Sequence, residues 1–94
     1  LANIMVRSQT QQTAIDMAAE IGNFFGPHPQ DLKVLGPAEA PIPRLKAEFR
    51  YQLLIKAASR KRLNDLLHNL RAYAEQKRWP ATSLVIDVDP LSLL

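Results

Sequence analysis

Residues 48–56 read EFRYQLLIK, and this stretch decides the fold. Side chains of two kinds alternate along it, which is typical of a strand that buries one face. The predicted core face carries Phe49, Tyr51, Leu53 and Ile55. The predicted open face carries Arg50, Gln52, Leu54 and Lys56.

A helix is predicted directly after this strand, beginning after Ser59. Leucines recur there at spacings of three and four residues, which places them on one side of a helix. The apolar stripe consists of Leu63, Leu66, Leu67, Leu70, Tyr73 and Ala74. Pro80 follows the end of the pattern, where a helix cannot continue.

The first half of the chain shows the same alternation of elements. Residues 3–7 predict a strand, and an apolar stripe up to Phe25 predicts a helix that Ser8 or Thr10 can cap and that Gly26 ends. Residues 32–35 predict a second short strand. The proline-rich residues 36–43 after it indicate a stiff connector or an edge-strand excursion. Residues 83–89 predict the last strand.

These elements predict one α+β domain over residues 1–94. The order strand-helix-strand-strand-helix-strand is that of the ferredoxin-like two-layer sandwich, a four-stranded antiparallel sheet with both helices on one face. Right-handed crossovers place the first and third strands in the centre of the sheet.

Positive charge is concentrated in the middle of the chain. Residues 44–62 hold seven of the 12 basic groups and one acid, a net charge of +6 within a whole-chain net charge of +3. Arg60, Lys61 and Arg62 also fall in the first turn of the predicted helix, where each cation costs about 0.3–1 kcal/mol. Such a placement favours an anionic partner, although a solvated basic face without a role remains an alternative.

The composition excludes several kinds of chemistry. The chain has no cysteine, so it has no disulfide, thiolate zinc site or cysteine nucleophile. Its three glycines fit no phosphate-binding loop, and no apolar run reaches the 18 or so residues of a membrane span. The chain begins with leucine, and we expect it to be a piece of a longer protein.

The remaining polar residues give little support for catalysis or metal binding. His28 and His68 lack a second ligand at a suitable spacing, so we expect surface histidines. Asp87 and Asp89 share a strand face, and we expect them to pair with Arg7 or Arg50. No serine or threonine shows a base partner.

The aromatic residues do not suggest a stacking RNA-recognition surface. Phe49 and Tyr51 are predicted on the core face of their strand, so its open face lacks the aromatic side chains on which bases stack in RNA-recognition modules. Trp79 could stack on an exposed base, but we expect it to pack over the edge of the core. Contacts with the phosphate backbone remain, with little sequence readout.

Three segments together resemble a known family. They are VLGPAEAPI at residues 34–42, FRYQLLIK at residues 49–56, and DVDP at residues 87–90. Their order and combination are similar to the C-terminal domain of the primosomal replication-restart helicase PriA, also called primosomal protein N′. The chain departs from the family pattern in the turn at Lys46-Ala47-Glu48 and lacks an aromatic before the final DVDP.

The resemblance implies a bacterial, cytoplasmic parent that is an ATP-dependent 3′→5′ DNA helicase. ATP, magnesium and zinc would belong to other parts of that parent, and this piece would be its non-catalytic DNA-binding module. The expected partners are single-stranded and branched DNA, single-stranded-DNA-binding protein and other primosome proteins. We expect a monomer with no membrane association.

The candidate contact residues follow from these two lines of reasoning. Those expected to contact DNA are Arg7, Arg50, Gln52, Lys56, Lys61 and Arg62. The resemblance assigns Arg60 to docking of the acidic, Phe-terminated tail of single-stranded-DNA-binding protein, and Asn64 stands where the family can carry a glutamine.

Two alternatives of other classes stay open. The first is a free-standing ferredoxin-like domain with a regulatory or assembly role, which binds a ligand or forms a dimer. The second is a small enzyme of the acylphosphatase kind. The second is disfavoured, because residues 8–11 (SQTQ) contain no glycine-rich phosphate cradle.

Overall fold

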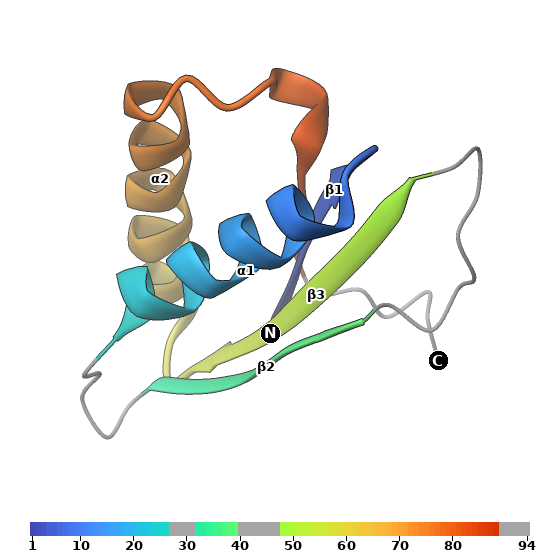
Figure 1. Cartoon of the computed structure of the whole chain (residues 1–94). Helices are drawn as coiled ribbons and strands as arrows, with labels where there is room; N and C mark the ends of the chain where they lie inside the picture. The colour runs from blue at the N-terminus through green and yellow to red at the C-terminus, as the bar shows by residue number, and fades with distance from the viewer. Residues whose placement is uncertain (27–31, 40–47, 89–94) are drawn as a thin grey trace.

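The computed structural model describes residues 1–26, 32–39 and 48–88. Its elements are β1 (Ala2–Ser8), α1 (Gln11–Phe25), β2 (Leu32–Glu39), β3 (Phe49–Ala57), α2 (Arg60–Gln76), a 3₁₀ turn (Ala81–Ser83) and β4 (Leu84–Val88). The strands form one antiparallel sheet in the order β2-β3-β1-β4, and both helices lie on one side of it (Figure 1). The predicted α+β, ferredoxin-like arrangement with β1 and β3 in the centre is confirmed.

The core lies between the sheet and the helices because each element buries one apolar side. On β3, Leu53 and Ile55 have no exposed surface, as their alternation predicts, and they lie opposite Ile4 and Ala2 of β1. The helices close this layer from above. Their largest fully buried side chains are Ile21 of α1 and Leu70 of α2.

Both helix starts follow the sequence, but only one has a side-chain cap. Ser59 precedes α2, and its Oγ accepts a hydrogen bond of 3.1 Å from the backbone N–H of Arg62. Thr10 stands at the N-cap of α1 without such a bond, and its own N–H donates to Ser8 Oγ at 3.1 Å. Gly26 ends α1 as predicted.

Strand β2 is longer than the sequence predicts. It continues past Leu35 to Glu39, with an irregularity in its pairing to β3 between Leu35 and Ala38. Gly36 makes this possible, because its φ of +104° is rarely open to other residues, and a Cβ there would lie 2.8 Å from the Gln52 carbonyl oxygen. Of the two predicted alternatives for residues 36–43, the edge-strand excursion is thus what the structure shows as far as Glu39, and residues 40–43 lie outside the described part.

A polar and aromatic cluster joins the two helices. Tyr73 Oη donates to Glu20 Oε1 at 2.7 Å, and Lys77 Nζ lies 2.8 Å from the same oxygen. Tyr73 also contacts the rings of Phe24, at 5.1 Å between centroids, and Trp79, at 5.9 Å. Trp79 is partly buried and packs against the core, as expected.

This cluster makes stability depend on pH through Glu20. Hydrogen bonds from Lys77 and Tyr73 lower the pKa of Glu20 below its ordinary value. The folded protein thus favours the carboxylate, so the stabilisation is complete above the unfolded pKa and is lost as pH falls through the folded pKa. We expect Glu20→Gln to lower the thermal midpoint by a few degrees at pH 7 and to have little effect near pH 3.

Thermal unfolding followed by circular dichroism at both pH values checks this. Asp16→Asn on the same helix is the matched control, since within the described residues Asp16 accepts a side-chain hydrogen bond from its own helix, from Gln12 at 2.8 Å. An equal effect of Glu20→Gln at both pH values would contradict the assignment.

Candidate nucleic-acid interface

The side of the sheet opposite the helices carries most of the predicted DNA contacts. Cross-strand pairing arranges its side chains in rows across the strands. The row at one end holds Arg7 opposite Arg50, and the row at the other end holds Lys33 opposite Lys56. Six positions of β3 separate Arg50 from Lys56, about 20 Å at the usual rise of a strand. The predicted cations therefore form two separate groups on this face.

The arginine end is internally compensated. Arg50 Nη2 lies 3.1 Å from Glu48 Oε1, and the Arg50 side chain is only 13% exposed. Arg7 donates from Nε to the Thr82 carbonyl oxygen at 2.6 Å. The sequence predicted that Arg7 and Arg50 lie on the open face, but it did not predict the ion pair between Arg50 and Glu48. Because of this pair, the arginine end carries less net positive charge than its two arginines suggest.

The lysine end contains a cation that the sequence reading missed. Lys33 pairs with Lys56 across β2 and β3, and both are exposed. Lys33 lies between Leu32, which is buried, and Val34, which packs against the core. That alternation is visible in the sequence and would have placed Lys33 on the open face; its pairing with Lys56 depends on the register.

Between the two cationic rows, the side chains of β2, β3 and β1 are apolar or neutral, and the exposed Asp87 of β4 lies in the same row as Leu54 and Asn3. Gln52 lies opposite Met5, and Leu54 lies opposite Leu35. Leu35 is 64% exposed. Phe49 and Tyr51 have the phase of the helix-covered side, and Tyr51 packs against the core. The packing of Tyr51 agrees with its predicted place on the core side of β3, away from the open face.

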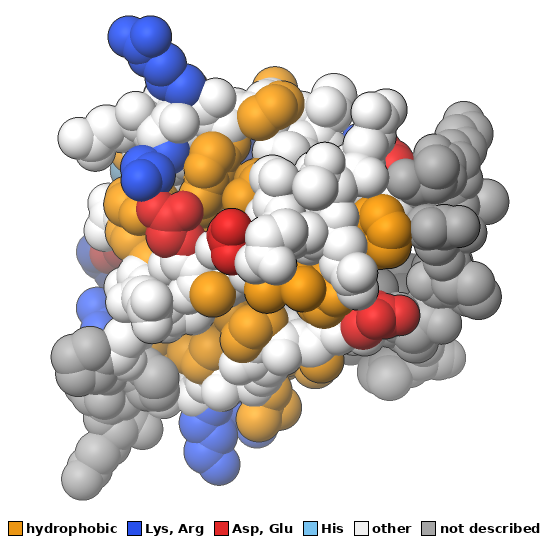
Figure 2. Space-filling model, viewed as in Figure 1, with side chains coloured by type: hydrophobic (Ala, Val, Ile, Leu, Met, Phe, Trp, Pro, Cys, Tyr) orange, Lys and Arg blue, Asp and Glu red, His pale blue; other side chains and the backbone are white. Residues whose placement is uncertain are grey.

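Figure 2 shows the surface of the molecule in the view of Figure 1, with both helices on one side of the sheet. Apolar side chains gather towards the middle, and Lys and Arg side chains stand at the margin. The basic groups that this view shows therefore project from the edges.

A further basic group, apart from the two on the sheet face, lies at the start of α2. Arg60, Lys61 and Arg62 occupy the first turn, which contains no acidic residue. Lys61 Nζ lies 3.2 Å from Asp65 Oδ2, one turn further along, and both side chains are well exposed. Exposed pairs of this kind contribute little, so Lys61 stays available to an outside anion.

A small hollow lies beside Arg60. It has a volume of about 170 Å³ and is lined by Leu1, Ala57, Ala58, Ser59, Arg60 and Leu63. Leu63 is almost fully buried there, so the hollow offers mainly polar surface beside a cation, which suits a carboxylate. Asn64 is exposed and does not line this hollow.

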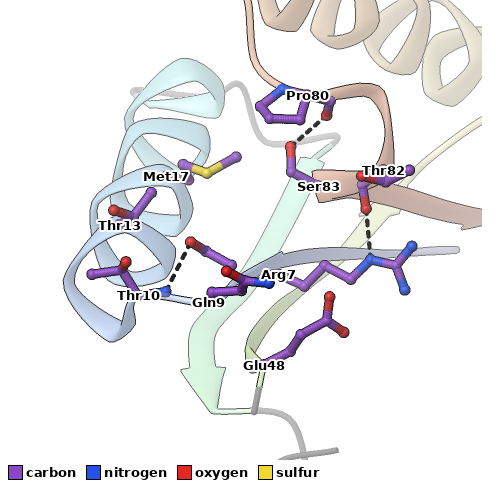
Figure 3. Close-up of a pocket in the computed structure, with 10 residues that line it drawn as sticks. Arg7, Gln9, Thr10, Thr13, Met17, Glu48, Pro80, Thr82 and Ser83 are labelled. Carbon is purple, nitrogen blue, oxygen red and sulfur yellow. Dashed lines mark hydrogen bonds between the residues drawn. The ribbon is translucent and has the colours of Figure 1, made fainter. Parts of the chain in front are cut away.

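A larger polar hollow lies where β1 meets α1. It measures about 390 Å³ and collects hydroxyl groups around Arg7 (Figure 3). Ser83 Oγ donates to the Pro80 carbonyl oxygen at 2.6 Å, and Ser8 Oγ accepts from the Thr10 N–H. The Ser8 and Ser83 hydroxyls thus bond to the backbone, and Glu48, the carboxylate in the lining, pairs with Arg50.

The titratable residues outside these groups form no further site. In the described ranges, no three His, Cys, Asp or Glu side chains gather as a metal site would need. His68 is exposed on α2, and His28 and Asp89 lie outside the described residues. The expected pairing of Asp87 with Arg7 or Arg50 is wrong, because Asp87 lies opposite Asn3, four positions along β1 from Arg7. Neither described helix is long and apolar enough to cross a bilayer.

Comparison with known proteins gives the family. The family model described as "Primosomal protein N C-terminal domain" matches residues 1–91. The chain belongs to this family. It is also 30% identical over its whole length to "Replication restart protein PriA" of Bacillus subtilis (strain 168), and 30% identical over 98% of its length to the protein of the same name from Haemophilus influenzae.

The chain spans only a small part of these relatives. It covers 12% of the Bacillus protein and 13% of the Haemophilus protein. Membership of the primosomal protein N C-terminal domain family connects the chain with replication restart and the primosome. The similarity confirms the resemblance seen in the sequence.

The cap of α2 can be tested by substitution. Ser59→Ala removes the acceptor for the Arg62 N–H, and we expect the free energy of unfolding to fall by about 1 kcal/mol. Ser59→Asp keeps an acceptor and adds a charge that suits a helix start, so it should be at least as stable as the wild type. Urea unfolding at pH 7 measures both, and an equal loss in the two variants would contradict a capping role.

Proposed function

We propose that this domain is the non-catalytic DNA-binding and partner-docking module of a bacterial, cytoplasmic replication-restart helicase that moves 3′→5′. ATP, magnesium and zinc would bind in other parts of that parent. The observation that carries the proposal is the basic, non-aromatic open face of the sheet in a member of the primosomal protein N C-terminal domain family. Its ligands are single-stranded and branched DNA.

The chemistry of the face favours phosphate contacts over base reading. Lys56 on this face and Lys61 at the start of α2 offer point charges, while Arg7 and Arg50 offer guanidinium groups. Gln52 and Asn3 are neutral hydrogen-bonding groups between the two ends of the face. Such contacts give affinity that falls with salt and depends little on sequence.

A salt titration tests DNA binding. With three or four phosphates contacted, the affinity of the 94-residue chain for a single strand should fall about 20- to 50-fold between 50 and 200 mM salt. Fluorescence anisotropy of labelled oligonucleotides of unrelated sequence, and of a forked substrate, measures this. A lack of binding at the lowest salt would remove direct DNA contact from the proposal.

The second part of the proposal is docking of an acidic protein tail at Arg60. Single-stranded-DNA-binding protein is the partner, and its tail would place a terminal carboxylate on Arg60 with the phenyl ring against Leu1, which lines the adjacent hollow. Asn64 would act from the rim, one turn along α2. Other primosome proteins would assemble on the remaining surface of the parent.

Charge reversal tests docking. We expect Arg60→Glu to weaken binding of an acidic Phe-terminated peptide about tenfold or more, because a hydrogen bond to a charged group contributes about 1.5–3 kcal/mol. A carboxylate is favourable at a helix start, so the variant should remain folded by circular dichroism. Arg71→Glu, further along the same helix, is the matched control. Equal affinities of Arg60→Glu and the wild type would reject the assignment.

The alternative of a free-standing regulatory or assembly domain has less support. The chain matches a small portion of much longer proteins, and its family description is that of a C-terminal domain. We propose a monomer, and light scattering distinguishes it from the stable dimer that the alternative requires.

A further inference from the structure

The pairing of β2 with β3 places two lysines side by side on the open face. Lys33 and Lys56 are directly opposite partners in the register. The Cβ atoms of such partners are about 4.5–5.5 Å apart, and like charges in this position destabilise a sheet. Folding alone would favour a carboxylate at one of the two positions.

This repulsion is not relieved within the described part of the protein. There, neither lysine forms an ion pair or a side-chain hydrogen bond. Arg7 and Arg50, the pair at the other end of the face, do have partners. Glu48 forms an ion pair with Arg50, and the Thr82 carbonyl oxygen accepts a hydrogen bond from Arg7. The lysine pair is therefore the site on this face where an external anion gains most.

The neighbouring row suggests which anion fits. Leu35 and Leu54 lie two positions along the same strands, on the same face and opposite each other. Two residues of a strand span about 6.7 Å, which is comparable with the reach from a phosphate to its own base. Leu35 is 64% exposed, although it is a large apolar side chain. A nucleotide with an unstacked base would contact both rows at once.

We propose that Lys33 and Lys56 together bind a phosphate of single-stranded DNA, whose base lies against Leu35 and Leu54. The proposal rests on the DNA-binding function above and assigns it to one end of the sheet. A duplex presents the same phosphates but hides the faces of its bases, so the leucine contact selects the single strand.

Neutralisation of either lysine tests the phosphate contact. In the 94-residue chain, Lys33→Gln and Lys56→Gln should each reduce the salt slope for a labelled oligothymidylate by about 0.7, which is about fivefold in affinity at 0.1 M salt. The control is Arg71→Gln, which removes the same charge from an exposed position on α2. It should change neither quantity by more than a small fraction of this.

Charge reversal separates binding from stability. Lys33→Glu gives Lys56 an opposite charge as its neighbour, so its thermal midpoint should be equal to or above that of the wild type while DNA affinity falls further than for Lys33→Gln. Leu35→Ser should weaken binding of the single strand and leave both the salt slope and the affinity for a duplex unchanged.

The outcomes distinguish the two levels of the proposal. If the wild type binds no DNA, both this site and the proposed DNA-binding function are overturned. If the wild type binds but Lys33→Gln behaves like Arg71→Gln, the lysine site alone is wrong. If Leu35→Ser affects single-stranded and duplex DNA equally, the base contact is overturned.

Discussion

The pairing of β1 with β3 is the constraint on which the rest of the molecule depends. Ile4 lies opposite Leu53, and these side chains are fully buried under the helices. A shift of one residue in this pairing would turn every one of these side chains towards solvent, so the core holds the register. The same register sets the other face, where Arg7 and Arg50 become partners although neither contributes to the core.

The register that the core holds thus decides which open-face positions lie opposite each other, but it does not require basic residues at those positions. Nothing in the packing requires a lysine at Lys33 or Lys56, since both side chains are exposed. The same holds at the start of α2, where Arg60 to Arg62 oppose the helix dipole while Ser59 supports it. Lysine and arginine at these positions make the fold slightly less stable than acidic residues at the same positions would. Binding of an anionic ligand would offset this loss of stability.

The sequence predicted what depends on local periodicity and missed what depends on contacts between distant segments. The alternation of β3, the α2 stripe after Ser59 and the end of α1 at Gly26 are all local, and all were right. The continuation of β2 beyond Gly36 was one of two predicted alternatives, and the sequence could not choose between them, because the choice depends on a positive φ at Gly36 and on pairing with β3. The candidate site divides in the same way, since the cations were identifiable but the burial of Arg50 against Glu48 and the partner of Lys56 were not.

The two proposed anion sites meet at one end of the domain. Lys56 is the last basic residue of β3, and only Ala57, Ala58 and Ser59 separate it from Arg60. Ala57 and Ala58 also line the hollow beside Arg60. Four residues cannot span more than about 14 Å between the Cα atoms of Lys56 and Arg60. Each of these side chains adds several ångströms, so the spacing of the two bound anions depends on the direction of the side chains as well as on the backbone. The short link between β3 and α2 thus joins a site on the open face of the sheet to a site at the start of a helix.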